Sequence, residues 1–325
     1  MKNLELLKKL DECEYPAEFL VARLLGKKGA LFRDWGAFID STNAVESLQN
    51  TIFYPFLKEN AAAGIWRFLR YEHLWVYKRM NSKLRMRFGS YFVYHEINTL
   101  VVCLRYLSGT KQQRGRVVQE LHNCLLHNDI QDILTRNINF IAILQALETR
   151  LTTYSELFAG LRAHYEKRGI AALEIFMRDC FLVSLLSVKQ PSMLKSFLQY
   201  MVDFHNCMSL AKCLRWHREA EPILISGGNI TVDRFQRAYF RQDLAPVLRF
   251  FRLKDVEGDT SDIQKLENAL LKSISRKLQR WSLQRSVDAD LLFYLWQQYC
   301  YTRNISMVLS TLLLDDEPVR RSIVA

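Results

Sequence analysis

Glycine and proline are scarce in this chain, whose 325 residues include 12 glycines and 6 prolines. Collagen-like and low-complexity chains need far more of both residues, so those classes are excluded. An all-β fold needs a glycine or proline turn about every 8–12 residues, which this composition does not supply. The scarcity therefore predicts long helices with few breaks.

Long apolar runs and paired cysteines are missing as well. The longest uncharged stretch, 291–302, covers 12 residues, whereas a membrane-spanning helix needs about 20 apolar residues. The first residues lack the apolar core of a signal peptide, and the seven cysteines include no Cys-x-x-Cys pair. We therefore expect a cytoplasmic protein that does not cross a membrane and whose thiols are reduced and mostly buried.

Motifs for catalysis and for phosphate binding are also lacking. The chain has no Gly-x4-Gly-Lys-Ser/Thr loop, no Gly-x-Ser-x-Gly and no Gly-x-Gly-x-x-Gly. The nearest set of metal-type ligands is His205, Cys207, Cys213 and His217. On one helix, positions 205 and 207 point about 200° apart, so a single ion could not bind all four side chains. We expect no catalytic residue, no cofactor and no metal site.

Apolar residues recur with the period of an α-helix through most of the chain. Within 266–278, apolar side chains fall at 266, 270, 274 and 278, which is one face of a helix. Similar stripes cover 93–104 and 173–185. The best extended segment, 223–225, is interpreted as a strut between helices. The pattern predicts an all-α fold.

A degenerate repeat accompanies this periodicity. A Leu-Glu pair at 173–174 and again at 266–267 is predicted to open a long helix, where the helix dipole favours a carboxylate. We interpret the pattern as three similar helical units of about 100 residues, although any all-helical chain yields some matches by chance. The predicted boundaries are 1–130, 131–245 and 246–325. Each unit carries an asparagine turn (Asn98, Asn206, Asn304), a loop (108–110, 226–229, 314–316) and a short helix (117–126, 232–239, 318–324).

These segments resemble the C subunit of the archaeal and bacterial V/A-type ATPases, which is similar to the d subunit of the vacuolar ATPase. Ser226 stands where that family usually has proline, and Ser310-Thr311 stand where it has Gly-Lys, so the chain resembles a divergent member. The N-terminal third matches worst. The segments that carry the resemblance are Tyr15 with Ala22-Arg23, Leu173-Glu174 with Asp179, Asp203-Phe204-His205-Asn206, 225–230, and 303–309 followed by 318–321.

The resemblance implies a funnel of three similar helical domains with pseudo-threefold symmetry. It also implies a non-catalytic rotor coupling subunit, peripheral to the cytoplasmic face of the membrane. Its partners would be the proteolipid ring and the central-stalk subunits, and the transported ion would be a proton or sodium. No small-molecule substrate is implied. The alternatives are a helical protein-binding scaffold and, less favoured, a basic nucleic-acid-binding protein; an enzyme is the most remote.

The net charge of +11 is concentrated in two stretches, 67–87 and 268–287. Arginine beside aromatic side chains can bind acidic groups by stacking and paired hydrogen bonds, so both stretches are candidate surfaces for acidic protein faces or lipid headgroups. The competing interpretation is a solvated helix face over an aromatic core. Nucleic acid is not expected, because no zinc finger, RNP motif or helix-turn-helix is present. The candidate residues are Arg67, Arg70, Lys78, Arg79, Lys83, Arg85, Arg87, Lys272, Arg276, Lys277 and Arg280.

Overall fold

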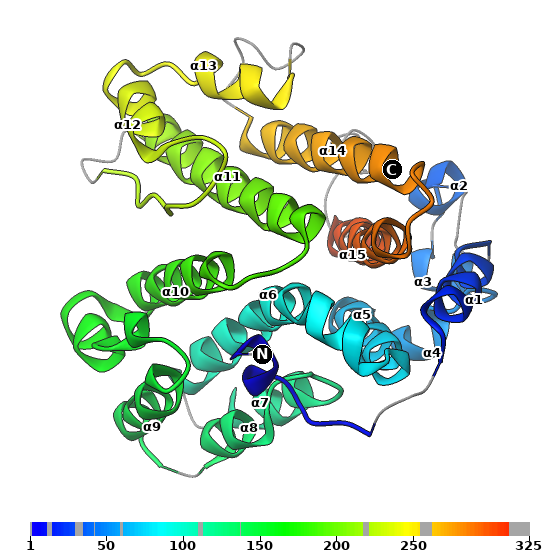
Figure 1. Cartoon of the computed structure of the whole chain (residues 1–325), viewed down its shortest axis with the longest axis horizontal. Helices are drawn as coiled ribbons and strands as arrows, with labels where there is room; N and C mark the ends of the chain where they lie inside the picture. The colour runs from blue at the N-terminus through cyan, green and yellow to red at the C-terminus, as the bar shows by residue number, and fades with distance from the viewer. Residues whose placement is uncertain are drawn as a thin grey trace. The chain divides into compact units, whose positions relative to one another are not determined.

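The chain is all-α (Figure 1). The computed structural model describes residues 2–11, 15–29, 35–41, 43–58, 61–109, 113–136, 138–216, 221–253 and 262–311. Across these ranges there are fifteen α-helices and three 3₁₀-helices, and the one extended pairing is an isolated bridge between Leu7 and Leu126. The predicted fold class is therefore confirmed, whereas the pseudo-threefold funnel stays a prediction.

The chain divides into two compact units. Unit 1 consists of Met1–Glu14, His73–Val202 and Ile225–Gly228. Unit 2 consists of Tyr15–Glu72, Asp203–Leu224 and Asn229–Ala325. Helices α5 and α11 each contribute residues to both units. The three sequence units at 1–130, 131–245 and 246–325 stay a prediction.

Helix α6 forms the core of unit 1, because η1, α7, α8 and α10 all pack on it. Eighteen of its 26 residues are buried, as expected for a helix that is covered on most sides. The stripe predicted over 93–104 lies on α6. The elements of this unit are η1 (Lys2–Leu6), α6 (Ser82–Leu107), α7 (Arg114–Leu121), α8 (Asn128–Thr135), α9 (Phe140–Thr152), η3 (Glu156–Phe158), α10 (Leu161–Ser187) and the first part of α11 (Ser192–Arg215).

Gly169 divides α10 into two helical halves. Its φ of 75° and ψ of −175° lie outside the helical region, in a conformation that glycine adopts without a steric penalty. The second half carries the predicted stripe, with Leu173, Met177 and Leu185 buried. The Leu-Glu pair at 173–174 therefore follows a kink instead of opening the helix.

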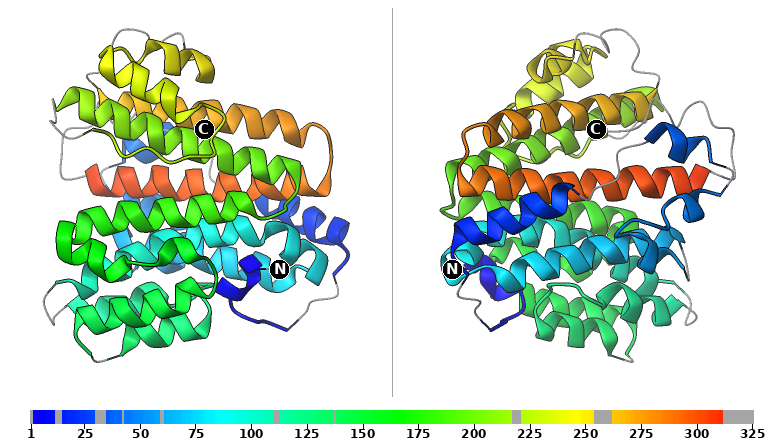
Figure 2. Two further views of the ribbon diagram at one scale, coloured as in Figure 1. Left: turned by 60° about the vertical axis from the view of Figure 1, so that its left-hand side comes forward. Right: turned by 90° about the vertical axis from the view of Figure 1, so that its right-hand side faces the viewer.

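Unit 2 is built around the antiparallel hairpin of α14 and α15, which lie side by side (Figure 2). The predicted stripe at 266, 270, 274 and 278 is buried on α14. The first helix, α1, packs along α15. The elements are α1 (Ala17–Gly29), α2 (Trp35–Ile39), α3 (Ala44–Ser47), α4 (Tyr54–Leu57), the first part of α5 (Ala61–Arg79), α12 (Val232–Phe240), α13 (Ala245–Leu248), η4 (Arg249–Phe251), α14 (Ile263–Ser282) and α15 (Val287–Thr311).

An apolar cluster joins the short helices of unit 2 to α5 and α15. Phe53 and Phe68 meet edge to face with ring centroids 4.7 Å apart, and Ile305 contributes from α15. A Cβ atom on Gly64 would lie 1.9 Å from the carbonyl oxygen of Phe56. Glycine is therefore required where α5 passes α4.

A buried carboxylate joins three helices of unit 2. Glu72 of α5 is 1% exposed, and Lys27 Nζ of α1 lies 2.6 Å from both of its oxygens. The hydroxyl of Tyr294 on α15 donates to Glu72 Oε1 at 2.7 Å. Burial and the neighbouring Glu72 raise the pKa of Tyr294, so its hydroxyl keeps the proton that it donates. A buried charge is tolerated only with such partners.

Substitution Lys27→Met is expected to destabilise the protein, because it leaves Glu72 charged and buried without its cation. Lys27 is 29% exposed, so the cost should fall below that of a fully buried pair, at about 2 kcal/mol. Urea unfolding measures it. The control is Lys167→Met, which removes the same charge from an exposed position of α10. Equal stability of both variants would contradict the role of Glu72.

Two histidines are buried together in unit 1. The rings of His73 and His95 lie 4.9 Å apart, and Tyr91 and Phe92 cover His73 edge to face. Burial lowers the pKa of His73 to about 3. Burial, and secondarily His73, also lowers the pKa of His95. Both side chains are therefore neutral in the folded protein.

The free energy of unfolding should fall as the pH drops below about 6.5. The unfolded chain binds protons at its histidines in that range, whereas folded His73 stays neutral until about pH 3. Each such histidine steepens the decline by up to about 1.4 kcal/mol per pH unit. Urea unfolding between pH 7 and pH 4.5 should give a shallower decline for His73→Phe. An unchanged slope in that variant would contradict this explanation.

Candidate partner-binding surfaces

The first basic stretch lies on the end of α5 and the start of α6. Lys78, Lys83 and Arg87 are exposed there. Arg79 is half-buried and stacks on Trp75, with its guanidinium carbon 4.1 Å from the ring centroid. Earlier on α5, Arg67 and Arg70 are half-buried, and Arg67 donates to the carbonyl of Phe56 at 3.5 Å. Three of the seven candidates therefore present their charge to solvent.

Arg85 has a structural position within this stretch. It is 6% exposed, and its guanidinium donates to the carbonyls of Tyr77, Lys78, Leu10 and Asp11 at 3.1, 3.1, 2.5 and 2.6 Å. Charged donors make hydrogen bonds about twice as strong as neutral ones. Arg85 thus ties the N-terminal segment to the end of α5, and its charge is not available at the surface.

The second basic stretch lies on α14. Arg276 and Arg280 are exposed, whereas Lys272 and Lys277 are half-buried. The ammonium of Lys277 lies 5.2 Å from the ring centroid of Trp281. Arginine and lysine that stack on tryptophan can still approach an acidic partner with their outer edge.

Five exposed arginines of unit 2 extend this second stretch, and the sequence pattern did not reveal them. They lie on α12, on η4 and in the turns that follow these helices. Ser273 of α14 donates from its hydroxyl to the carbonyl of Phe251 in η4 at 2.9 Å, which joins the two regions. Two acids, Asp233 and Asp243, lie among these arginines and lower the net charge of the segment in the linear sequence. The arginines are Arg234, Arg237, Arg241, Arg249 and Arg252.

Asp203 connects two of the motif segments recognised in the sequence. It is fully buried on α11, and its carboxylate accepts hydrogen bonds from the backbone N–H groups of Asn229 and Ile230, both at 3.0 Å, and from the Asn229 side chain at 2.9 Å. Burial raises the pKa of Asp203, while these hydrogen bonds and Lys277 act in the opposite direction. Asp203 therefore holds Asn229 and Ile230, at the end of the loop 226–229, in place.

Glu174 and Glu267 make ion pairs, which corrects their predicted role at helix starts. Glu174 pairs with Arg105 of α6 through two hydrogen bonds at 2.8 and 2.6 Å. Glu267 lies 3.3 Å from Arg303 of α15, which also donates to Asn268 at 2.8 Å. The dipole acts mainly within the first helical turn, and both glutamates lie beyond it. Each carboxylate instead links two packed helices of its own unit.

Three of the four metal-type ligands considered in the sequence, His205, Cys207 and Cys213, lie on α11. No group of three or more His, Cys, Asp or Glu side chains in the described ranges could hold a metal ion. Cys207 is fully buried, and burial raises the pKa of its thiol. His217, Cys13, the loop at 314–316 and the predicted helix at 318–324 lie outside the described residues.

No helix among the described residues combines the length and the apolar content needed to cross a bilayer.

A family model described as ATP synthase (C/AC39) subunit matches residues 43–311. The match covers 269 of the 325 residues, including α5, α6, α10, α14 and α15. The chain belongs to this family. The resemblance inferred from 173–179, 203–206, 225–230 and 303–309 is thereby confirmed. The family is that of a non-catalytic subunit of the V-type ATP synthase. No curated protein matches the sequence.

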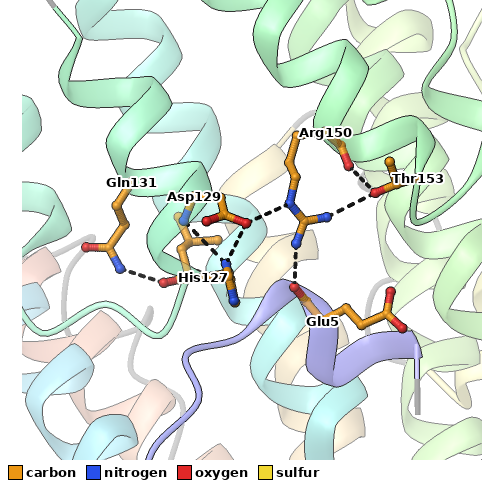
Figure 3. Close-up of polar contacts among 7 residues, drawn as sticks. Glu5, His127, Asp129, Gln131, Arg150 and Thr153 are labelled. Carbon is orange, nitrogen blue, oxygen red and sulfur yellow. Dashed lines mark hydrogen bonds and ion pairs between the residues drawn. The ribbon is translucent and has the colours of Figure 1, made fainter.

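The N-terminal segment of this C/AC39 subunit precedes the matched region yet is integrated into unit 1 (Figure 3). Arg150 of α9 donates to the carbonyl of Glu5 at 2.8 Å and lies 3.5 Å from Asp129 of α8. Asn3 is buried between Ser90 and Tyr154, with hydrogen bonds of 2.6 and 2.7 Å. These contacts fasten η1 to α6, to α9 and to the turn that follows α9.

Substitution Asp203→Ala is expected to release residues 229–230 and to destabilise unit 2. It removes the acceptor of three hydrogen bonds and leaves a buried backbone N–H without a partner, at a cost of about 2 kcal/mol. Hydrogen exchange should accelerate at the amides of Asn229 and Ile230. Asp203→Asn keeps one acceptor oxygen and should give a smaller effect. Unchanged exchange in the alanine variant would show that the loop does not depend on Asp203.

Proposed function

We propose that this C/AC39 subunit is the rotor coupling subunit of a V/A-type ATPase. It links the central stalk to the membrane proteolipid ring and takes part in proton or sodium transport without catalysing a reaction. It works at the cytoplasmic face, peripheral to the membrane. The observation that carries this proposal is the family match over 43–311, which covers the long helices of both units.

The packing of the long helices supports a mechanical role. A coupling element must transmit torque without deforming, and side chains packed at native density give low compressibility. Ion pairs between helices add resistance to sliding: Glu174 and Arg105 link α10 to α6, and Glu267 and Arg303 link α14 to α15. Each ion pair lies within one unit, so each unit has an ion pair of its own that links two of its helices.

The exposed basic side chains are the proposed contacts with acidic surfaces of the stalk or the ring. Lys78, Lys83 and Arg87 on unit 1, with Arg276 and Arg280 on unit 2, present their charge to solvent. The half-buried candidates contribute positive charge near these contacts; they are Arg67, Arg70, Arg79, Lys272 and Lys277. Arg85 is not proposed as a contact, because its guanidinium donates to backbone carbonyls within the protein. Complementary charge accelerates and orients such association.

Deletion of the chain in its source cell tests the function. The rotor role predicts that membrane vesicles lose ATP-driven ion pumping, while the detached catalytic part retains ATP hydrolysis. Expression of the intact chain should restore pumping. Unimpaired pumping would contradict the proposal, and a stable soluble partner in the absence of the ATPase would favour the helical scaffold instead.

The double variant Lys83→Glu/Arg87→Glu should weaken association with the ATPase. Reversal of two exposed charges replaces attraction by repulsion at an acidic partner, and the dissociation constant should rise about tenfold or more. Restored pumping in a titration of the purified protein into depleted membranes measures this. Lys167→Glu/Arg168→Glu on α10 reverses the same charge at exposed positions outside both candidate surfaces. Equal loss in both variants would refute a specific contact.

A further inference from the structure

Unit 2 carries an arginine surface that lies outside the side chains proposed above for contact with the stalk or the ring. It comprises Arg234, Arg237, Arg241, Arg249 and Arg252, all exposed within 231–253, together with Phe240. Against these five cations stand two acids, Asp233 and Asp243. Asp243 is occupied at the start of α13, where its carboxylate accepts the N–H of Ala245 at 2.9 Å. With five arginines against two acids, the surface is net positive.

Hydrogen bonds hold this surface together and join it to α14. Arg234 of α12 donates to the carbonyl of Pro246 in α13 at 3.0 Å, and Ser273 fastens η4 to α14. Arg276 and Arg280 follow Ser273 by three and seven residues, so they share its face of α14. Figures 1 and 2 show α13 beside α14. The arginine surface therefore adjoins Arg276 and Arg280 without including them.

Phe240 is the apolar part of the arginine surface. Helix α12 is amphipathic: Phe235 and Ala238 are buried, whereas Phe240 at its end is 69% exposed. Arg237 lies one turn before Phe240, and Arg241 follows it directly. A short helix with a basic face and an exposed aromatic ring is typical of segments that lie at a membrane interface.

We propose that the arginine surface binds anionic phospholipid headgroups, with Phe240 entering the boundary between headgroups and acyl chains. Guanidinium groups match phosphate oxygens with paired hydrogen bonds, which favours arginine over lysine for this ligand. All five cations of the surface are arginines. Their distribution over α12, η4 and the turns that follow suits several separate headgroups, and the exposed ring suits an apolar layer beneath them. Lipid alone suffices for this binding, so the proposal goes beyond the rotor coupling role.

Sedimentation of the full-length chain with vesicles tests the proposal. Vesicles of phosphatidylcholine mixed with phosphatidylserine should bind the chain, and rising salt should weaken the binding because it screens exposed charges. Vesicles of phosphatidylcholine alone should bind it much more weakly. Equal binding to both compositions would overturn the proposal.

Two variants locate the binding on α12. Arg237→Gln/Arg241→Gln should weaken vesicle binding about 25-fold, since each basic residue near an anionic surface contributes about fivefold. Phe240→Ser should weaken it about fivefold through loss of the inserted ring. Because all three side chains are exposed, the variants should fold, which thermal unfolding checks. The matched control Lys167→Gln/Arg168→Gln removes two exposed charges from α10 and should bind as the intact chain does.

Three outcomes would contradict lipid recognition. The control Lys167→Gln/Arg168→Gln could lose as much vesicle binding as Arg237→Gln/Arg241→Gln, which would show that binding depends on net charge alone. Phe240→Ser could bind vesicles as strongly as the intact chain, which would show that the Phe240 ring does not enter the lipid layer. The chain could bind polyglutamate but no vesicles, which would assign the surface to an acidic protein. No ATPase component is present in the assay, so its failure leaves the rotor coupling proposal standing.

Discussion

Buried polar groups that are satisfied only by other helices determine how this protein packs. Glu72 is the clearest case, because its carboxylate binds Lys27 of α1 and Tyr294 of α15 from its own position on α5. Apolar contacts alone would tolerate small slides of one helix along another. A buried carboxylate does not, since loss of either partner leaves a desolvated charge or acceptor. The register of three helices in unit 2 therefore depends on this one group.

Similar polar contacts recur elsewhere in unit 2. Asp203 holds Asn229 at the end of the loop 226–229. Arg303 of α15 binds both Glu267 and Asn268 of α14. Such networks also specify a single arrangement more sharply than apolar packing does. A protein proposed to couple two moving parts of a rotary machine needs this rigidity within each unit. The proposed contact residues, such as Lys83 and Arg276, are in contrast exposed.

Periodicity in the sequence predicted most of the fold, because a helix that buries one face must repeat its apolar residues. The stripe at 266–278 is buried as expected, and the predicted short helix at 232–239 is α12. The kink at Gly169 was missed, since an isolated glycine in a helical pattern is usually tolerated.

Arg85 was placed at the surface because nothing local distinguishes it from its exposed neighbours. Its four carbonyl partners come together only in the tertiary structure. The arginine surface was missed for a related reason, because two acids lie among its arginines in the sequence and it is joined to α14 only by folding.

Co-purification shows whether this chain joins the membrane ring to the central stalk, as proposed. The intact chain, tagged and expressed in its source cell, would be isolated from gently solubilised membranes, and the proteins that accompany it identified. If the chain couples the two, the proteolipid ring and the central-stalk subunits are recovered together with it. Recovery of neither, or of the stalk alone from membranes that contain the ring, would contradict the coupling role.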